Sequence, residues 1–484
     1  MNPYIVIGII AAYFAIILVV SRLTSRNSQA GDFYRGNKKT PWWVVAFGMI
    51  GTTLSGVTFI SVPGWVASSA KMTYFEVILG NFLGYILIMQ VLLPLYYRLN
   101  LTSIYTFIEQ RFGFKAYKTG AVLFLGSKII GAGFRLFIIA LVLQMAVFEP
   151  LGLPFALNAI LSVFLIWAYT FRGGVKTIIW TDVIQTAALI FAVIFTIGAI
   201  QQELGWSFSK MTAEITHHPQ FQLFDFSHFW TNGNNFFKQF VSGALITIVM
   251  TGIDQDMMQK NLGLKTLRTA KKNFFSFSLA LVPVNFIFLC LGVLFVIFMQ
   301  QKGIPLPSKT DAIYPQLALQ YLPQAVGICF IVGVIAAAFS SANSAMIAMT
   351  TSFMVDIYGI KNRSEATLRR TRQLVHGANA AVLAAVLVMF EAFNNDSVVQ
   401  AVFKFAGYTY GPLLGLFAVG IMTKLRIRDA AVPWIAIFSI VATVLTDKYS
   451  TVILGGYRFG FEILLFNGLI TVLGLWLFSL RRHK

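Results

Sequence analysis

Apolar segments long enough to cross a lipid bilayer recur along almost the whole chain. A helix needs about 20 mostly apolar residues to span the hydrocarbon core. Hydrophobic residues make up 57% of the 484 and charged residues only 11%, and the mean hydropathy is +0.74. This composition excludes a soluble protein and predicts an all-α integral membrane protein. We predict thirteen spanning helices, at about residues 3–21, 42–66, 73–97, 119–148, 154–170, 177–202, 237–253, 274–300, 323–357, 374–391, 398–422, 430–446 and 459–480.

The basic charge of the chain is distributed as a topology signal. The formal net charge is +19, from 37 Lys and Arg against 18 Asp and Glu. When loops are assigned alternately to the two sides, one side holds most of the basic residues, among them Arg22, Arg26, Arg35, Lys38, Lys39, Lys265, Lys271, Lys272, Arg369, Arg370, Arg372, Arg481, Arg482 and Lys484. Because Lys and Arg gather in cytoplasmic loops, we expect a multi-pass protein of the inner (plasma) membrane, with its N-terminus outside and its C-terminus cytoplasmic. The charge indicates the lipid bilayer as partner and no nucleic acid.

A ladder of polar residues interrupts the apolar segment 323–357. Ser340, Ser341, Asn343 and Ser344 follow three alanines and lie on neighbouring faces of a helix. Serines in membrane helices often bond back to the carbonyl one turn earlier or allow close helix packing. Neutral oxygens gathered within the membrane also suit a hard cation stripped of its water. The ladder therefore predicts an ion site.

A second polar interruption lies far upstream, between Gly48 and Thr58. The sequence there carries the glycines Gly48, Gly51 and Gly56 and four hydroxyl residues inside an apolar segment. This pattern is typical of an unwound membrane helix, whose freed carbonyls can bind an ion or a substrate. Two such segments in one chain favour a transporter.

Several motifs of the chain resemble the sodium/solute symporter family. They are Asp32-Phe33-Tyr34-Arg35-Gly36, the stretch 52–59 (TTLSGVTF), the stretch 179–185 (IWTDVIQ), the stretch 254–259 (DQDMMQ) and the Ser340 ladder. They occur in the family's order over essentially the whole chain, and the nearest match in motifs is to bacterial sialic-acid-transporting members.

The resemblance implies the LeuT-type architecture, in which two inverted five-helix repeats are accompanied by flanking helices. We expect residues 1–484 to form a single transporter domain, with an extra N-terminal helix and cytoplasmic linker at 1–41, repeat one at 42–202, repeat two at 237–422 and C-terminal helices at 423–484. The first helix of each repeat would be broken, at Gly48–Gly56 in one repeat and at Ser242-Gly243 and Thr251-Gly252 in the other.

The resemblance also implies a sodium site shared by the family. Its ligands would be the backbone carbonyls of Gly51, Leu54 and Ala337 and the hydroxyls of Ser340 and Ser341. The bound ion would then join helices of opposite repeats.

A second sodium site, present in some members of the family, would use Ser340, Asn343, Ser344 and the carboxylate of Asp182. Asn343 departs from the family pattern, which has a hydroxyl there, although an amide oxygen can still bind a cation. Asp182 also lies close to the predicted cytoplasmic start of its helix, where an acid would favour the helix dipole without any ion. The two readings of Asp182 stay open.

A substrate cavity is expected beside the first helix break. Its lining would include Thr53, Ser55, Thr58 and Asn81, with a contribution from Gln239 or Phe240 on the seventh span. Arg135 matches a position at which sialic-acid-transporting members place an arginine that faces the substrate carboxylate. A planar guanidinium suits a carboxylate, although a structural pairing of Arg135 is the alternative. Lys128, two helical turns earlier, would extend to the membrane interface.

These features predict a secondary active symporter that couples inward sodium movement to uptake of a small organic solute, a sugar acid or another organic anion. The alternatives are uptake of a neutral sugar or amino acid, and less favourably a transporter-derived sensor or a channel. We expect no enzyme, because no nucleophile has a placed base and no His, Cys or acidic ligands cluster in the sequence. The sodium ion is the only cofactor expected. A monomer is the default, while the solute, the sodium stoichiometry and the oligomeric state stay open.

Overall fold

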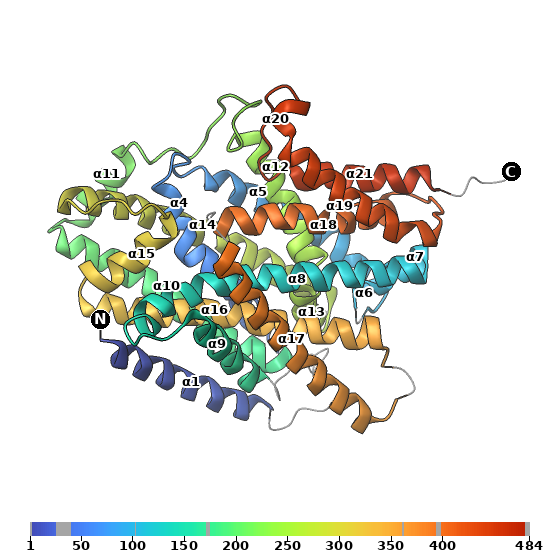
Figure 1. The fold of residues 1–484 in the computed structure, drawn as a ribbon, viewed down its shortest axis with the longest axis horizontal. Coiled ribbons are helices and arrows are strands. Elements are labelled where there is room, and N and C mark those ends of the chain that lie inside the picture. Colours follow the sequence, from blue (N-terminus) through green and yellow to red (C-terminus); the bar gives the residue numbers. More distant parts are fainter. Residues whose placement is uncertain are drawn as a thin grey trace.

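Helices form nearly all of the structure. The computed structural model describes residues 2–25, 40–101, 103–170, 175–360, 363–393 and 398–479, and these ranges contain no β-strand. The motif Asp32–Gly36 lies outside the described residues, as do the basic residues predicted at 26–39 and 481–484. Helix α1 lies along one edge of the bundle and α19 with α21 along another, while α8 and α16 run between them (Figure 1).

The elements of the first half of the chain are α1 (Pro3–Ser25), α3 (Trp42–Thr53), η1 (Val57–Ser61), α4 (Val62–Val66), α5 (Tyr74–Leu87), η2 (Ile88–Leu92), α6 (Leu93–Arg98), α7 (Thr106–Phe112), α8 (Phe114–Leu143), η3 (Gln144–Phe148), α9 (Phe155–Thr170), α10 (Val175–Glu203) and α11 (Phe208–His217). The second half contains α12 (Phe236–Thr247), η4 (Ile248–Gly252), α13 (Gln255–Leu262), α14 (Leu267–Lys302), η5 (Thr310–Ala312), α15 (Ile313–Gln316), η6 (Leu317–Tyr321), α16 (Gln324–Ser352), η7 (Phe353–Tyr358), α17 (Glu365–Phe393), α18 (Val398–Met422), η8 (Asp429–Ala431), α19 (Val432–Lys448), α20 (Ser450–Ile453) and α21 (Ile463–Leu477).

The apolar helices follow the predicted spans. Among the described residues, 9 helices are long and apolar enough to cross a membrane, and two bent helix pairs raise the number to 11. Two shorter apolar helices, Phe155–Ala168 and Ile463–Leu477, complete the set. Each of the thirteen predicted segments overlaps one of these elements, so the multi-span helical architecture is confirmed. The number of helices that cross the bilayer stays a prediction.

The first helix break lies where the sequence predicts it. Helix α3 ends at Thr53, the chain resumes as a π-helical turn at Val57, and the two parts are bent by 60°. In a regular helix the N–H of Ser55 would donate a hydrogen bond to the carbonyl of Gly51. Here it donates to the carbonyl oxygen of Thr53 at 3.0 Å. The break therefore releases the Gly51 carbonyl from its regular helical partner.

The second break is only partly where the sequence places it. Ser242 and Gly243 lie inside the continuous helix α12, where Ser242 donates to the carbonyl of Lys238, so the break predicted there is wrong. The chain bends by 62° after Gly252, at the second predicted point. It then continues as the buried helix α13, beyond the end of the span predicted at 237–253.

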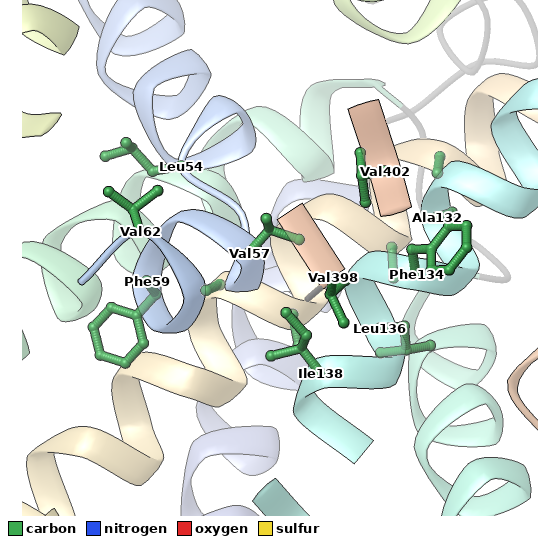
Figure 2. Close-up of a cluster of buried hydrophobic side chains, with 14 of the residues drawn as sticks. Leu54, Val57, Phe59, Val62, Ala132, Phe134, Leu136, Ile138, Val398 and Val402 are labelled. Atoms are coloured by element: carbon green, nitrogen blue, oxygen red, sulfur yellow. The ribbon is translucent and has the colours of Figure 1, made fainter. Parts of the chain in front are cut away.

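Hydrophobic side chains fix the restarted part of the first broken helix. Val57 lies on the side of Ile138 from α8 and Val398 from α18, while Phe59 points the other way (Figure 2). All four are buried. These apolar contacts hold the restarted segment against α8 and α18, while polar residues of the break line the cavity described below.

Glycines allow α5 and α12 to pack closely. A Cβ atom on Gly80 would collide with the backbone carbonyl of Phe240, and one on Gly243 would collide with that of Val77. Small residues at such crossings let membrane helices approach until their backbones touch. The crossing matters because both helices line the cavity described below.

We expect Gly80→Ala to destabilise the protein by about 1–3 kcal/mol, because the backbone carbonyl of Phe240 cannot yield as a flexible side chain would. The matched control is Gly126→Ala in α8, where an added Cβ meets no atom within 4 Å. The unfolding temperatures of the purified proteins in detergent measure both changes. Equal unfolding temperatures for the two variants would contradict close packing at Gly80.

Candidate ion and solute site

A cavity of about 100 Å³ lies beside the first helix break. Its lining includes all five residues predicted to bind the solute, namely Thr53, Ser55, Thr58, Asn81 and Arg135. The first three come from the broken helix, Asn81 from α5 and Arg135 from α8. The structure thus brings together side chains from three separated parts of the sequence, and their role in binding stays a prediction.

Arg135 lies between this cavity and a second one that Asp254 and Tyr410 help to line. Within the part of the chain that the structure describes, its guanidinium makes no hydrogen bond or ion pair. A guanidinium carries five N–H donors in a planar fork. Arg135 is therefore able to bind a group that enters the cavity.

The seventh span contributes to the cavity, but through other residues than those predicted. Gln239 donates to the carbonyl of Gly233 and to Asn234, and neither Gln239 nor Phe240 lines the cavity, so that prediction is wrong. The lining residues lie further along the same span, at Ile246, Thr247, Met250 and Thr251.

Asn81 also ties two helices together. In the orientation that its neighbours require, its amide nitrogen donates to Thr247 Oγ1 at 3.0 Å and to the carbonyl of Gly243 at 2.9 Å. These bonds cross from α5 to α12, so Asn81 supports the cavity wall as well as lining it.

The residues predicted for the shared sodium site lie on two helices that pack against each other, Gly51 and Leu54 at the end of α3 and Ala337, Ser340 and Ser341 on α16. Ser340 donates to Asp182 Oδ1 at 2.8 Å, which leaves its lone pairs available to a cation. Ser341 Oγ is buried with no hydrogen-bond partner among the described residues. Buried hydroxyls normally have a hydrogen-bond partner, and a bound cation at Ser341 Oγ would supply the missing one.

The second predicted sodium site contains a lysine that the sequence reading missed. Lys260 of α13 reaches Asp182 Oδ2 at 2.7 Å, and the side chains are 3% and 0% exposed. The same ammonium donates to Thr52 Oγ1 at 2.6 Å and to Ser344 Oγ at 2.8 Å. Lys260 follows directly after the 254–259 motif, and its place next to that motif was the available signal.

One expectation about this site changes with the structure, and the role of Asn343 as a sodium ligand stays a prediction. Asp182 lies beyond the first turn of α10, fully buried and bonded to Lys260, so a role in capping the helix dipole is wrong. Asn343 is buried, and neither atom of its amide has a hydrogen-bond partner within the described ranges. It does not join the hydrogen bonds around Asp182.

A second buried cluster forms part of the cavity wall through Lys128 and Asp256. Lys128 of α8 contacts Asp254 at 3.0 Å and Asp256 at 2.9 Å, and Tyr410 donates to Asp254 at 3.2 Å. The prediction that Lys128 extends to the membrane interface is therefore wrong, because its side chain is 8% exposed and paired. A lysine within a span together with two acids in a predicted loop was the signal for this cluster.

Two tyrosine hydroxyls bind backbone carbonyls at the second break. Tyr96 donates to the carbonyl of Gly252 at 2.8 Å and Tyr105 to that of Ile253 at 2.9 Å. Both hydroxyls satisfy carbonyls that the end of the helix leaves without an intrahelical partner. No spacing in the sequence indicates these pairs.

A helical bundle with two broken helices, a polar cavity at one break and buried ion pairs between them defines a multi-pass membrane transporter. Residues 33–431 match the model of the Sodium:solute symporter family, and the chain belongs to this family.

Relatives and solved structures agree with this assignment. The chain is 27% identical over 473 residues to the sodium/sialic acid symporter NanT of Aliivibrio fischeri, covering 92% of this chain and 88% of that protein. It is 25% identical over 465 residues to the sodium/sialic acid symporter SiaT of Proteus mirabilis, with 92% and 89% covered. A solved structure of a substrate-bound, outward-open Na⁺-coupled sialic acid symporter superposes with a TM-score of 0.82 at 21% identity, over 98% of this chain and 97% of that one. The fold expected from the sequence is thereby confirmed, while the division into repeats stays a prediction.

We expect Lys128→Met to destabilise the protein by about 3–5 kcal/mol, because it leaves two buried carboxylates without their counter-charge. The matched control is Lys404→Met, which removes a 2.9 Å pair with Asp447 whose lysine side chain is 55% exposed. Exposed pairs contribute only about 0.2–1 kcal/mol. Thermal unfolding in detergent compares the two, and similar losses would contradict the buried cluster.

Proposed function

We propose that the chain is a sodium-coupled symporter that takes up a small organic anion across the plasma membrane. It would act as a monomer, with its N-terminus outside and its C-terminus cytoplasmic. The observation that carries the proposal is the hydroxyl of Ser341, which lies next to Ser340 on α16 and is buried without a hydrogen-bond partner among the described residues. Membership of the symporter family supports sodium as the ion.

Sodium would bind to oxygens from both helices. The carbonyl of Gly51 is released by the break, and Ser340 is held by Asp182 with its lone pairs free. A cation bound to these groups and to Ser341 would fasten α3 to α16. If residues 42–202 and 237–422 are inverted repeats, this ion would join the two repeats. The repeats must move apart when the transporter alternates between its outward-open and inward-open states.

The solute would bind in the adjoining cavity. Thr53, Ser55 and Thr58 offer hydroxyls, and the fork of Arg135 offers a place for a carboxylate. Sialic acid, the solute named for NanT and SiaT, is a sugar acid, which fits both the hydroxyls and the guanidinium. A neutral sugar or amino acid is the rival, and the Arg135 variant below separates the two.

When one sodium ion enters together with one organic anion, no net charge crosses the membrane, so the sodium concentration gradient supplies the free energy that drives accumulation. With a neutral solute, a membrane potential of 100 mV would add about 2.3 kcal/mol per sodium ion. Uptake of sialic acid and of a neutral sugar into proteoliposomes, with sodium present or absent in the outer medium, tests the proposal directly.

We expect Ser341→Ala and Ser340→Ala each to raise the sodium concentration for half-maximal uptake about fivefold, because one neutral oxygen ligand contributes on the order of 1 kcal/mol. The control is Ser439→Ala in α19, a buried serine that bonds within its own helix. Sodium titration of uptake by proteoliposomes measures all three. Unchanged sodium dependence in both ladder variants would place the ion elsewhere.

We expect Arg135→Lys to raise the sialic acid concentration for half-maximal uptake about tenfold or more, since an ammonium cannot reproduce the two parallel bonds of the fork. Arg268→Lys, at an exposed position near the start of α14, is the matched control. If Arg135→Lys transports sialic acid as well as the native protein, Arg135 is structural and the anionic solute loses its main support.

A further inference from the structure

We infer that Lys260 is a tethered cation that fills the place of the second sodium ion, so that the chain binds one sodium ion and not two. The inference rests on the proposed sodium-coupled function and goes further, since it fixes the stoichiometry. Three observations carry it: the identity of the oxygens around the ammonium, the use of all three N–H donors of the ammonium, and the anchoring of the backbone next to Lys260.

The oxygens around the ammonium overlap with the ligands expected for the second sodium. Asp182 and Ser344 were both predicted as ligands of that ion, and both accept hydrogen bonds from Lys260. Ser340, the third predicted ligand, donates to the other oxygen of the same carboxylate. Lys260 therefore lies where the sodium ion would lie.

The hydrogen-bonding capacity of the ammonium is fully used. It has three N–H donors, and it meets three oxygens, those of Thr52, Asp182 and Ser344, at 2.6–2.8 Å. An ammonium is a compact point charge of the same sign and size of charge as sodium. Two such cations cannot share one carboxylate in a buried site without strong repulsion.

The backbone that carries Lys260 is anchored independently. Tyr97 donates to the carbonyl of Asn261 at 2.8 Å, and Asn273 donates to the Asn261 side chain at 2.6 Å. Both bonds fix the residue next to Lys260 against other helices. The lysine thus supplies the charge of the second ion permanently and is not carried across the membrane.

The residues present do not fit a second sodium ion in the native chain. Asn343, the remaining predicted ligand, makes no hydrogen bond to this group of residues in the described structure. Removal of the lysine would change this, because Asp182, Thr52 and Ser344 would then face a space without a counter-charge. A buried carboxylate requires a cation, so the site would accept sodium.

The test is equilibrium binding of radioactive sodium to the purified full-length protein in detergent, in a buffer with an organic cation. We expect one sodium ion per native chain and two per Lys260→Ala chain. The matched control is Lys265→Ala, which removes an exposed lysine five positions further along and should keep the number at one. A count that stays at one in Lys260→Ala, or a count of two in the native protein, would overturn the inference.

A second variant decides the matter if Lys260→Ala fails to fold. Ser344→Ala removes an oxygen that serves Lys260 in the native chain, so the number of bound sodium ions should stay at one. Loss of one sodium ion from an initial two would show that Ser344 binds the ion itself and would overturn the inference. Binding of no sodium by the native protein would overturn the proposed function and this inference with it, whereas one sodium ion in both the native and Lys260→Ala chains would overturn the inference alone.

Discussion

The buried pair of Lys260 and Asp182 joins four helices that lie far apart in the sequence. Lys260 belongs to the second broken helix and reaches the first one through Thr52, while Asp182 and Ser344 belong to the packed helices α10 and α16. Charges taken out of water stabilise a structure only when their geometry is good and their remaining bonds are made. Here all three donors of the ammonium and both oxygens of the carboxylate are engaged.

The two helix breaks differ in the hydrogen bonds that their carbonyls accept, and this difference bears on the proposed sodium site. At the second break, hydroxyls of Tyr96 and Tyr105 occupy the carbonyls of Gly252 and Ile253. At the first break, the N–H that would serve Gly51 turns to Thr53 instead. Oxygens that are already bonded attract a cation less than free ones. The first break therefore suits the proposed sodium site better than the second.

The sequence predicted what depends on local pattern and missed what depends on contacts between distant segments. Hydropathy located the helices, because a spanning segment must be apolar over its whole length. Glycine and hydroxyl residues located the first break. The same reasoning misplaced part of the second break at Ser242-Gly243, because a glycine needed for close packing against Val77 resembles one needed for a break. Lys260 lies directly after the 254–259 motif, but no pattern in the sequence indicates that Asp182 lies beside it.

The formal charges of the buried site favour an anion as the solute that accompanies a single sodium ion. Lys260 and Asp182 cancel, and around the cavity Lys128 and Arg135 balance Asp254 and Asp256. One sodium ion with a neutral solute would leave an uncompensated positive charge in the membrane interior, where unpaired charge is costly. One sodium ion together with one carboxylate keeps the net formal charge of the site at zero. If Lys260 takes the place of the second ion, the one remaining sodium ion would match one negative charge on the solute, and Arg135 would offer the carboxylate a place in the cavity.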